Sequence, residues 1–222
     1  MEGEAAHHVG RVLRAQSGQV YELSDGNHVW LARVEEVKRD RIGFSLVEEL
    51  PVYRPAFQAT LLLSIVKFDA FEWAIEKATE LGVSTIVPLA AARSEKALLA
   101  AAPKRSERWT KVLLEASQQS RRLSVPKLTE VARFETAAAA CTEGMRVMLS
   151  ELDDAPPMRK VLEAQHTTRA TLAIGPEGGW TDAEFAAAQA AGFQQASLGK
   201  QVLRTETAVI AALASLNFAL GE

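Results

Sequence analysis

The chain has 222 residues and a mass of 24.1 kDa, and its 48% apolar and 24% charged residues exclude disordered and fibrous proteins. The single cysteine, Cys141, excludes a disulfide scaffold and any site that holds a metal through several cysteines, so no metal is expected. The net charge is −3, but residues 93–133 carry ten basic groups against four acidic ones, which fits either a surface for a polyanion or a solvated helix face.

The N-terminus reads Met-Glu-Gly-Glu-Ala-Ala-His-His, without the basic and apolar regions that are typical of a signal peptide. No stretch approaches the roughly 18 apolar residues that a membrane span needs. We therefore expect a soluble, cytoplasmic protein that does not associate with a membrane.

The first 54 residues predict a small all-β unit. Segments 20–23, 28–37 and 42–47 alternate apolar and polar residues, and turns separate them. The unit is too short for a sandwich and about long enough for a compact barrel. Pro51 and Pro55 bracket a linker at which the composition changes, so we divide the chain into domains 1–54 and 55–222.

From residue 57 onward, strands and helices are expected to alternate. The predicted strands are 59–66, 85–87, 127–131, 146–149, 170–174 and 195–198, and the predicted helices are 70–81, 106–120, 134–140, 157–164, 181–191 and 205–220. Gly82 is expected to end the first helix and Pro88 the second strand, and Thr181 with Glu184 predicts a capping box. Apolar strands that alternate with helices predict an α/β domain whose parallel sheet is covered on both faces.

A glycine-rich segment, Gly175-Pro176-Glu177-Gly178-Gly179, stands between a predicted strand and a predicted helix. Ligands bind α/β proteins at the carboxyl ends of parallel strands, and glycine lets backbone N–H groups approach them closely. The segment is neither a P-loop nor a dinucleotide fingerprint. It predicts a ligand-binding loop, with a tight structural turn as the alternative.

A second loop, residues 198–204, joins the last predicted strand to the last helix. Thr205 is expected to cap that helix, whose free amide groups would then face a ligand. Leu198, Val202 and Leu203 would form an apolar slot, whereas Arg204 and Glu206 are most simply a local ion pair. Alone, this loop favours neither a ligand site nor a structural turn.

Several motifs follow one another in a characteristic order: Glu80-Leu81-Gly82-Val83 with Pro88, Arg93-Ser94, Gln119 with Arg122 and Pro126, Gly175 to Gly179, and Leu203 to Ala208. Together with His8-Val9-Gly10-Arg11-Val12-Leu13-Arg14, this set resembles the bacterial 16S ribosomal RNA (uracil-N3) methyltransferase family, of the knotted SPOUT superfamily. The resemblance runs from about His8 to the C-terminus. Its most specific part is the pair Gly-Pro-Glu-Gly-Gly and Leu-Arg-Thr-Glu-Thr.

This resemblance implies an N-terminal PUA-like β-barrel that binds RNA and a C-terminal domain with a deep trefoil knot. It implies S-adenosylmethionine as the cofactor, 16S rRNA or the 30S subunit as the partner, and a homodimer that pairs near the last helix. The implied cofactor-binding residues are Leu149, Gly175, Pro176, Glu177, Gly178, Gly179, Leu198, Gly199, Leu203 and Thr207. A valine at Gly178 is expected to block the cofactor pocket.

The implied reaction requires the uracil to lose its N3 proton, which is held at neutral pH. An enzyme can supply a base or can stabilise the anion that spreads onto O2 and O4. Arg93, Arg122 and Arg204 are the predicted catalytic residues, with Arg122 at the target base, because a guanidinium has fork geometry and permanent charge. Glu177 is a base, a group that orients the cofactor, or a charge at a helix N-terminus. The base must be unpaired or flipped out, since N3 faces its pairing partner in a duplex.

The residues expected to hold the RNA backbone are Arg11, Arg14, Lys104, Arg105, Arg108, Lys111 and Arg121. Two other functions remain open. A 2′-O-methyltransferase of the same superfamily, acting on tRNA or rRNA, would need no ionisation of N3. A non-catalytic RNA-binding or ribosome-assembly factor would use the barrel and the basic segment, and the intact cofactor loops argue against it.

Overall fold

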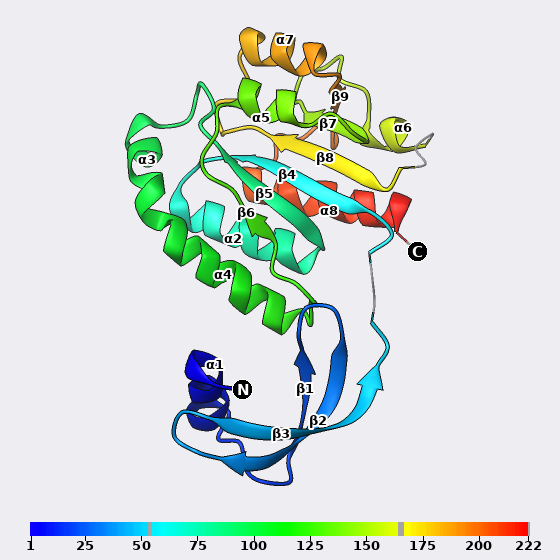
Figure 1. Ribbon diagram of the computed structural model, residues 1–222. Coiled ribbons are helices and arrows are strands. Elements are labelled where there is room, and N and C mark those ends of the chain that lie inside the picture. The colour runs from blue at the N-terminus through cyan, green and yellow to red at the C-terminus, as the bar shows by residue number, and fades with distance from the viewer. Residues whose placement is uncertain (53–54, 164–166, 222) are drawn as a thin grey trace. The chain divides into compact units, whose positions relative to one another are not determined.

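The computed structural model describes residues 1–52, 55–163 and 167–221, and the chain forms two compact units, Met1–Arg54 and Pro55–Glu222 (Figure 1). We call these the N-terminal and C-terminal units. None of the helices in the described ranges is long and apolar enough to span a membrane. Within those ranges no cluster of histidine, cysteine and carboxylate side chains could hold a metal ion.

The N-terminal unit is a three-stranded antiparallel sheet in the order β1-β2-β3, formed by β1 (Val20–Ser24), β2 (Val29–Val37) and β3 (Ile42–Leu50). The predicted strands are thus confirmed. In the described part of this unit β1 and β3 each pair with β2 alone, so the three strands do not close on themselves. A short helical segment that the alternation did not predict, α1 (Gly3–His7) with a π-helical turn (His8–Val12), precedes them. The core of the unit is small, with Ala6, Ala15, Val34 and Ile42 buried together.

The C-terminal unit is an α/β domain with a six-stranded parallel sheet in the order β6-β5-β4-β8-β7-β9. Its strands are β4 (Gln58–Ser64), β5 (Val83–Leu89), β6 (Lys127–Leu128), β7 (Met145–Leu149), β8 (Arg169–Ile174) and β9 (Gln194–Ala196). Its helices are α2 (Phe68–Glu80), α3 (Lys96–Ala101), η2 (Ala102–Arg105, a 3₁₀ turn), α4 (Ser106–Gln119), α5 (Phe134–Ala140), α6 (Met158–Leu162), α7 (Asp182–Ala190) and α8 (Thr205–Leu220).

Helices cover both faces of this sheet, as the apolar strands predicted. Leu61 and Leu63 of β4 pack with α2 and α8 on one face, while Leu62 packs with α5 and α7 on the other (Figure 1). All three leucines are fully buried. Side chains of successive strand residues point to opposite faces, so a strand that is buried on both sides has to be apolar at every position.

The structure corrects some predicted boundaries. β5 does not end at Pro88 but continues to Leu89, because Pro88 pairs with Leu63 and its carbonyl accepts the N–H of Ala132 at 3.0 Å. The missing N–H of proline is tolerated there. β6 is shorter than 127–131, and helix α3 was not predicted. Residue 164, at the end of the predicted helix 157–164, lies outside the described residues.

Candidate active site

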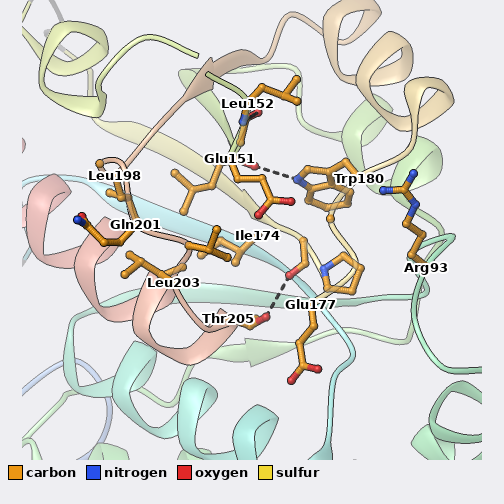
Figure 2. A pocket seen from close by; sticks show the side chains of 18 of the residues that line it. Arg93, Glu151, Leu152, Ile174, Glu177, Trp180, Leu198, Gln201, Leu203 and Thr205 are labelled. Atoms are coloured by element: carbon orange, nitrogen blue, oxygen red, sulfur yellow. Dashed lines mark hydrogen bonds between the residues drawn. The ribbon is translucent and has the colours of Figure 1, made fainter. Parts of the chain in front are cut away.

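Three loops enclose a cavity at the carboxyl edge of the sheet (Figure 2). They follow β7, β8 and β9, and parallel strands present their carboxyl ends at one edge, where α/β proteins bind ligands. The lining residues are Leu149, Ser150, Glu151, Leu152, Ile174, Gly175, Pro176, Glu177, Gly179, Trp180, Leu198, Gly199, Gln201, Val202, Leu203 and Thr205, together with Arg93, Phe185 and Ala208. We call this space the first cavity.

Two hydrogen bonds tie the three loops together. The indole N–H of Trp180 donates to the carbonyl of Leu149 at 2.9 Å, and the hydroxyl of Thr205 donates to the carbonyl of Gly175 at 3.3 Å (Figure 2). Thr205 therefore does not cap α8 as expected: it is the first residue of the helix, after Arg204, and its side chain holds the glycine loop instead. Gly175 packs against the Trp180 ring, where an added Cβ would lie 3.0 Å from a ring carbon.

Backbone conformation and close contacts explain two further glycines. Gly179 has a φ of +69°, which glycine adopts readily, and an added Cβ would lie 3.0 Å from Oε1 of Glu151. Gly178 belongs to the other side of the loop. A Cβ there would lie 3.3 Å from Cβ of Arg93, and Gly178 is not part of the first cavity. A valine at Gly178 would thus press on Arg93, rather than fill the first cavity as expected.

A buried carboxylate fixes the loop that follows β5 and carries Arg93. Glu184 is 2% exposed, and its carboxylate accepts the N–H of Ala92 at 2.9 Å as well as the N–H and hydroxyl of Thr181 at 2.9 and 2.8 Å. Arg93 in turn donates from Nη1 to the carbonyl of Gly178 at 2.8 Å. The predicted capping box is confirmed. The second role of Glu184, at the Arg93 loop, had no sequence signal because the two loops are about 90 residues apart.

Most of the predicted cofactor residues lie around the first cavity. Those lining it are Leu149, Gly175, Pro176, Glu177, Gly179, Leu198, Gly199 and Leu203, while Gly178 and Thr207 lie outside. Thr207 is exposed on α8. The main residues missed are Glu151, Leu152, Trp180 and Gln201. Trp180 directly follows the Gly-Gly pair, and this position is the one signal that could have found it.

The three predicted catalytic arginines lie in different places. Arg93 lines the first cavity, and Arg204 is exposed beside it, after Leu203. In the described part of the chain Arg204 forms no ion pair with Glu206, so the expected pair is wrong.

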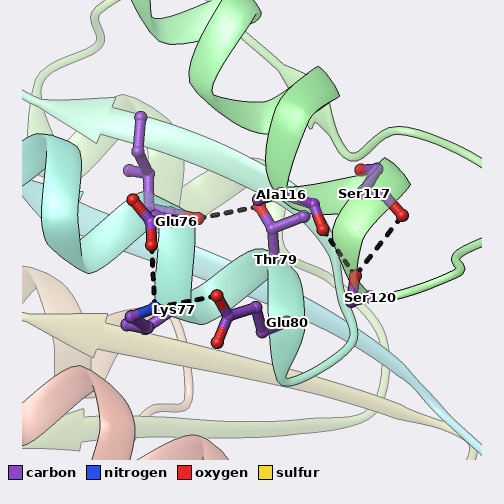
Figure 3. Close-up of polar contacts among 8 residues, drawn as sticks. Glu76, Lys77, Thr79, Glu80, Ala116, Ser117 and Ser120 are labelled. Atoms are coloured by element: carbon purple, nitrogen blue, oxygen red, sulfur yellow. Dashed lines mark hydrogen bonds and ion pairs between the residues drawn. The ribbon is translucent and has the colours of Figure 1, made fainter. Parts of the chain in front are cut away.

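Arg122 lies at the opposite edge of the sheet. Its Nη1 donates to the carbonyl of Thr79 at 2.7 Å, near the end of α2, and burial lowers the pKa of its guanidinium below the ordinary value. Because α2 leads from the carboxyl end of β4 to the amino end of β5, this point is remote from the first cavity of the same chain. Figure 3 shows the surrounding helix ends, where Lys77 bonds Glu80 at 2.8 Å and the hydroxyl of Ser120 donates to the carbonyl of Ala116 at 2.7 Å.

Some of the predicted RNA-binding residues make contacts within the protein. Arg108 donates from Nε to Glu72 at 2.9 Å, and Arg105 lies 3.6 Å from the same carboxylate and stacks over Phe68. Lys111 lies 3.8 Å from Glu115, a distance at which an exposed pair is worth little. Lys104, Arg11 and Arg14 are exposed. Arg121 has a φ of +54° at the end of α4.

The fold and the cavity agree with an RNA methyltransferase domain that follows a small β unit in the sequence. Residues 53–217 match the family model of the RNA methyltransferase domain, and residues 2–46 match that of the RNA methyltransferase PUA domain. The ribosomal RNA small subunit methyltransferase E of Synechocystis sp. is 34% identical over 227 residues, which cover 95% of this chain and 70% of that protein. The chain belongs to the ribosomal RNA small subunit methyltransferase E family, which confirms the family that the motifs indicated.

Two further relatives cover nearly the whole chain. The ribosomal RNA small subunit methyltransferase E of Bacillus subtilis is 29% identical over 230 residues, covering 97% of this chain and 88% of that protein. The crystal structure of a ribosomal RNA small subunit methyltransferase E from Neisseria gonorrhoeae, bound to S-adenosyl methionine, has a TM-score of 0.89. It is 29% identical and covers 100% of this chain and 91% of that chain.

Proposed function

We propose that the protein transfers a methyl group from S-adenosylmethionine to N3 of a uridine in the 16S rRNA of the small ribosomal subunit. The observation that carries the proposal is the first cavity, which loops from three parallel strands enclose at the carboxyl edge of the sheet. The family supports the substrate class, and the cofactor-bound relative from Neisseria gonorrhoeae supports the methyl donor.

The residues around the first cavity fit this cofactor. Leu149, Ile174 and Leu203 offer apolar surface for an adenine ring, and the carboxylate of Glu151 suits the positive charge of a sulfonium or an ammonium group. Gly179 leaves open the space beside Glu151 that a Cβ would fill. When bound, S-adenosylmethionine supplies an electrophilic methyl group. The protein then mainly positions the methyl donor and the uracil and excludes water from them.

Arg93 is the side chain best placed to assist the uracil. It lines the first cavity, and its Nη1 is held by Gly178, while the guanidinium has further N–H donors for an oxygen that gains charge. Glu177 lies on the same wall and is exposed, so its carboxylate can accept the N3 proton. Arg204 is a second donor at the rim. The uridine would have to be unpaired, since a duplex hides its N3.

We infer that the three loops form the deep trefoil knot of the SPOUT superfamily and that the N-terminal unit is a PUA-like domain that helps to hold RNA. The match of residues 2–46 to the PUA family model supports the second inference. Exposed basic residues in both units, including Arg11, Arg14 and Lys104, supply charge for the phosphate backbone. The protein would act in the cytoplasm, where its rRNA substrate is found.

We also propose a homodimer that pairs through α8. Val209, Leu213 and Leu216 are buried in the unit's own core. Apolar residues are also exposed on this helix, namely Ala214, Ala219 and Phe218, which is 94% exposed. A role for Arg122 at the target base requires a second copy, because the first cavity of its own chain lies at the far edge of the sheet.

The proposed function is tested by incubating purified protein with labelled S-adenosylmethionine and either 30S subunits or naked 16S rRNA. The RNA is then digested and its nucleosides are identified by mass spectrometry. We expect 3-methyluridine. A 2′-O-methylated nucleoside would show that the protein methylates ribose and not N3. RNA binding without cofactor binding would show that the protein is a non-catalytic RNA-binding factor.

A further inference from the structure

A second cavity adjoins the first. It lies at the carboxyl ends of β4 and β5, and its lining includes Val66, Lys67 and Leu98, as well as Arg93, Pro176 and Glu177. The last three residues line both cavities. A ligand in one cavity is therefore the immediate neighbour of a ligand in the other. We propose that the second cavity receives the target uracil, an inference that rests on the proposed methyltransferase function.

The direction of the Glu177 side chain supports a cofactor in the first cavity and the uracil in the second. In Figure 2 its carboxylate extends away from Glu151 and Leu203, two other residues that line the first cavity. Gly178, the next residue, lines the second cavity only, and its carbonyl holds the guanidinium of Arg93 at 2.8 Å. Arg93 and Glu177 are thus available to a group in the second cavity, while the cofactor has Glu151.

The polar groups of the second cavity complement the edge of uracil that carries N3. That edge presents a carbonyl oxygen, the N3–H donor and another carbonyl oxygen. The cationic side chains of Lys67 and Arg93 can donate to the two oxygens, and the carboxylate of Glu177 can accept from N3–H. Val66 and Leu98 add apolar surface for the faces of the ring. Cytosine has an amino group in place of one oxygen and no proton on N3, so it would leave a cation facing a donor.

The reaction balances with these groups. The N3–H bond breaks and its proton passes to the carboxylate of Glu177, leaving an electron pair on N3 and negative charge shared with O2 and O4. That electron pair forms the new N3–CH₃ bond, while the bond between the methyl carbon and the sulfonium sulfur breaks and its electrons remain on sulfur. Lys67 and Arg93 stabilise the uracil anion, and Glu177 releases the proton to solvent after the transfer.

Lys67→Ala tests the proposal, because Lys67 lines the second cavity and not the first. We expect the single-turnover methylation rate, with RNA and cofactor saturating, to fall about tenfold to a hundredfold, as for the loss of a bond to a charged group. Cofactor affinity by calorimetry and the thermal unfolding midpoint should stay at the wild-type values. Lys96→Ala, which removes another exposed lysine that lines neither cavity, is the matched control and should methylate normally.

A second readout separates anion stabilisation from phosphate binding. If Lys67 stabilises the N3 anion, the rate reduction caused by Lys67→Ala should be smaller at high pH. It should also be smaller with RNA that contains 5-fluorouridine, because the N3 proton of that base is more acidic. Leu98→Trp, which fills the same cavity, should abolish methylation and leave cofactor binding intact. Normal single-turnover rates in Lys67→Ala and Leu98→Trp would overturn the proposal. Failure of the wild-type protein to methylate RNA would instead overturn the proposed function.

Discussion

Glu184 is a buried carboxylate whose three hydrogen bonds reach two separate loops. One oxygen accepts from Ala92, beside Arg93, and the other accepts twice from Thr181, at the start of α7. A carboxylate with only acceptor sites suits a position that faces only donors. The orientation of Arg93 therefore depends on a side chain that lies outside both cavities.

Glu184→Gln should destabilise the protein, because either orientation of the amide places its NH₂ group against a backbone N–H. We expect the free energy of unfolding in urea to fall by about 1–3 kcal/mol. The methylation rate should fall as the Arg93 loop loosens, with cofactor affinity little changed. Glu135→Gln, at an exposed glutamate in the first turn of α5, is the control. An unfolding midpoint equal to that of the wild type would show that the Ala92 and Thr181 bonds are not needed.

Gly179→Ala should weaken cofactor binding. At a φ of +69° an alanine costs about 1–2 kcal/mol in backbone conformation, and its Cβ would press on Glu151 inside the first cavity. Gly82→Ala carries the same kind of strain at a φ of +90°, with no atom within 4 Å of the added Cβ, and lies remote from the cavity. Calorimetry with S-adenosylmethionine should show a loss of affinity in the first variant alone. Equal affinities in both would remove Gly179 from the cofactor site.

Arg122→Ala should lower the free energy of unfolding. We expect this loss whether or not Arg122 acts at the target base of a second copy in a dimer. The guanidinium is a second donor to the carbonyl of Thr79, which also accepts the N–H of Gly82 at 3.0 Å. The variant therefore loses one hydrogen bond from a charged group, which contributes about 1.5–3 kcal/mol. Urea unfolding measures this loss, and Arg122→Lys should restore part of it. The catalytic role is measured separately, by the single-turnover rate with both substrates saturating. A normal rate would leave Arg93 and Arg204 as the arginines that act at the base.

At the scale of elements, the sequence predicted those whose apolar pattern is long. Helix 205–220 was predicted at both ends, because a long apolar stretch from Ala208 to Leu220, interrupted only by Ser215 and Asn217, follows the polar start Thr-Glu-Thr. Segments that depend on partners were harder to predict. β5 continues through Pro88 because the residues around Pro88 pair with β4. Helix α3 has only six residues and lies just before Pro103, so it is too short to show a helical period in the sequence. The helical start of the N-terminal unit, Gly3–Val12, has no apolar stripe that would distinguish it from a loop.

Helix α8 is the element on which the proposed dimer depends. Phe218→Asp places a charge on its 94% exposed apolar position, so we expect a dimer to dissociate to monomers in sedimentation at micromolar concentration. The fold of each copy should persist, because Phe218 makes no contribution to the buried core. Val12→Asp, at a 65% exposed apolar residue of the N-terminal unit, should leave the dimer intact. A wild-type protein that sediments as a monomer would rule the dimer out.

At the scale of the whole molecule, the candidate site combines loops that are remote in the sequence. The two glycine-bearing loops, 175–179 and 198–204, could be predicted, because glycine and apolar residues at the carboxyl ends of parallel strands indicate a ligand-binding loop in an α/β protein. Glu151, Leu152 and the bond from Trp180 to Leu149 could not, since only the packing of β7 beside β8 brings these residues together. The second cavity was missed for the same reason: it joins residues 65–67, 93–95, 98 and 176–178.

The distribution of charge over both units leads to a prediction about RNA affinity. Binding to a polyanion releases counterions, so each lost phosphate contact weakens affinity and flattens its dependence on salt, by roughly 0.7 per contact for a single strand. Arg11→Gln with Arg14→Gln removes two exposed cations from the N-terminal unit, and we expect weaker binding to a 16S rRNA fragment and a slope reduced by about 1–1.5. Cofactor affinity should not change, because the first cavity is built from the C-terminal unit alone. The control is Lys38→Gln with Arg39→Gln, which removes the same charge from a turn of the N-terminal unit. If the salt dependence flattens equally in the two double variants, then net charge, and not a contact of Arg11 or Arg14 with RNA, determines the affinity.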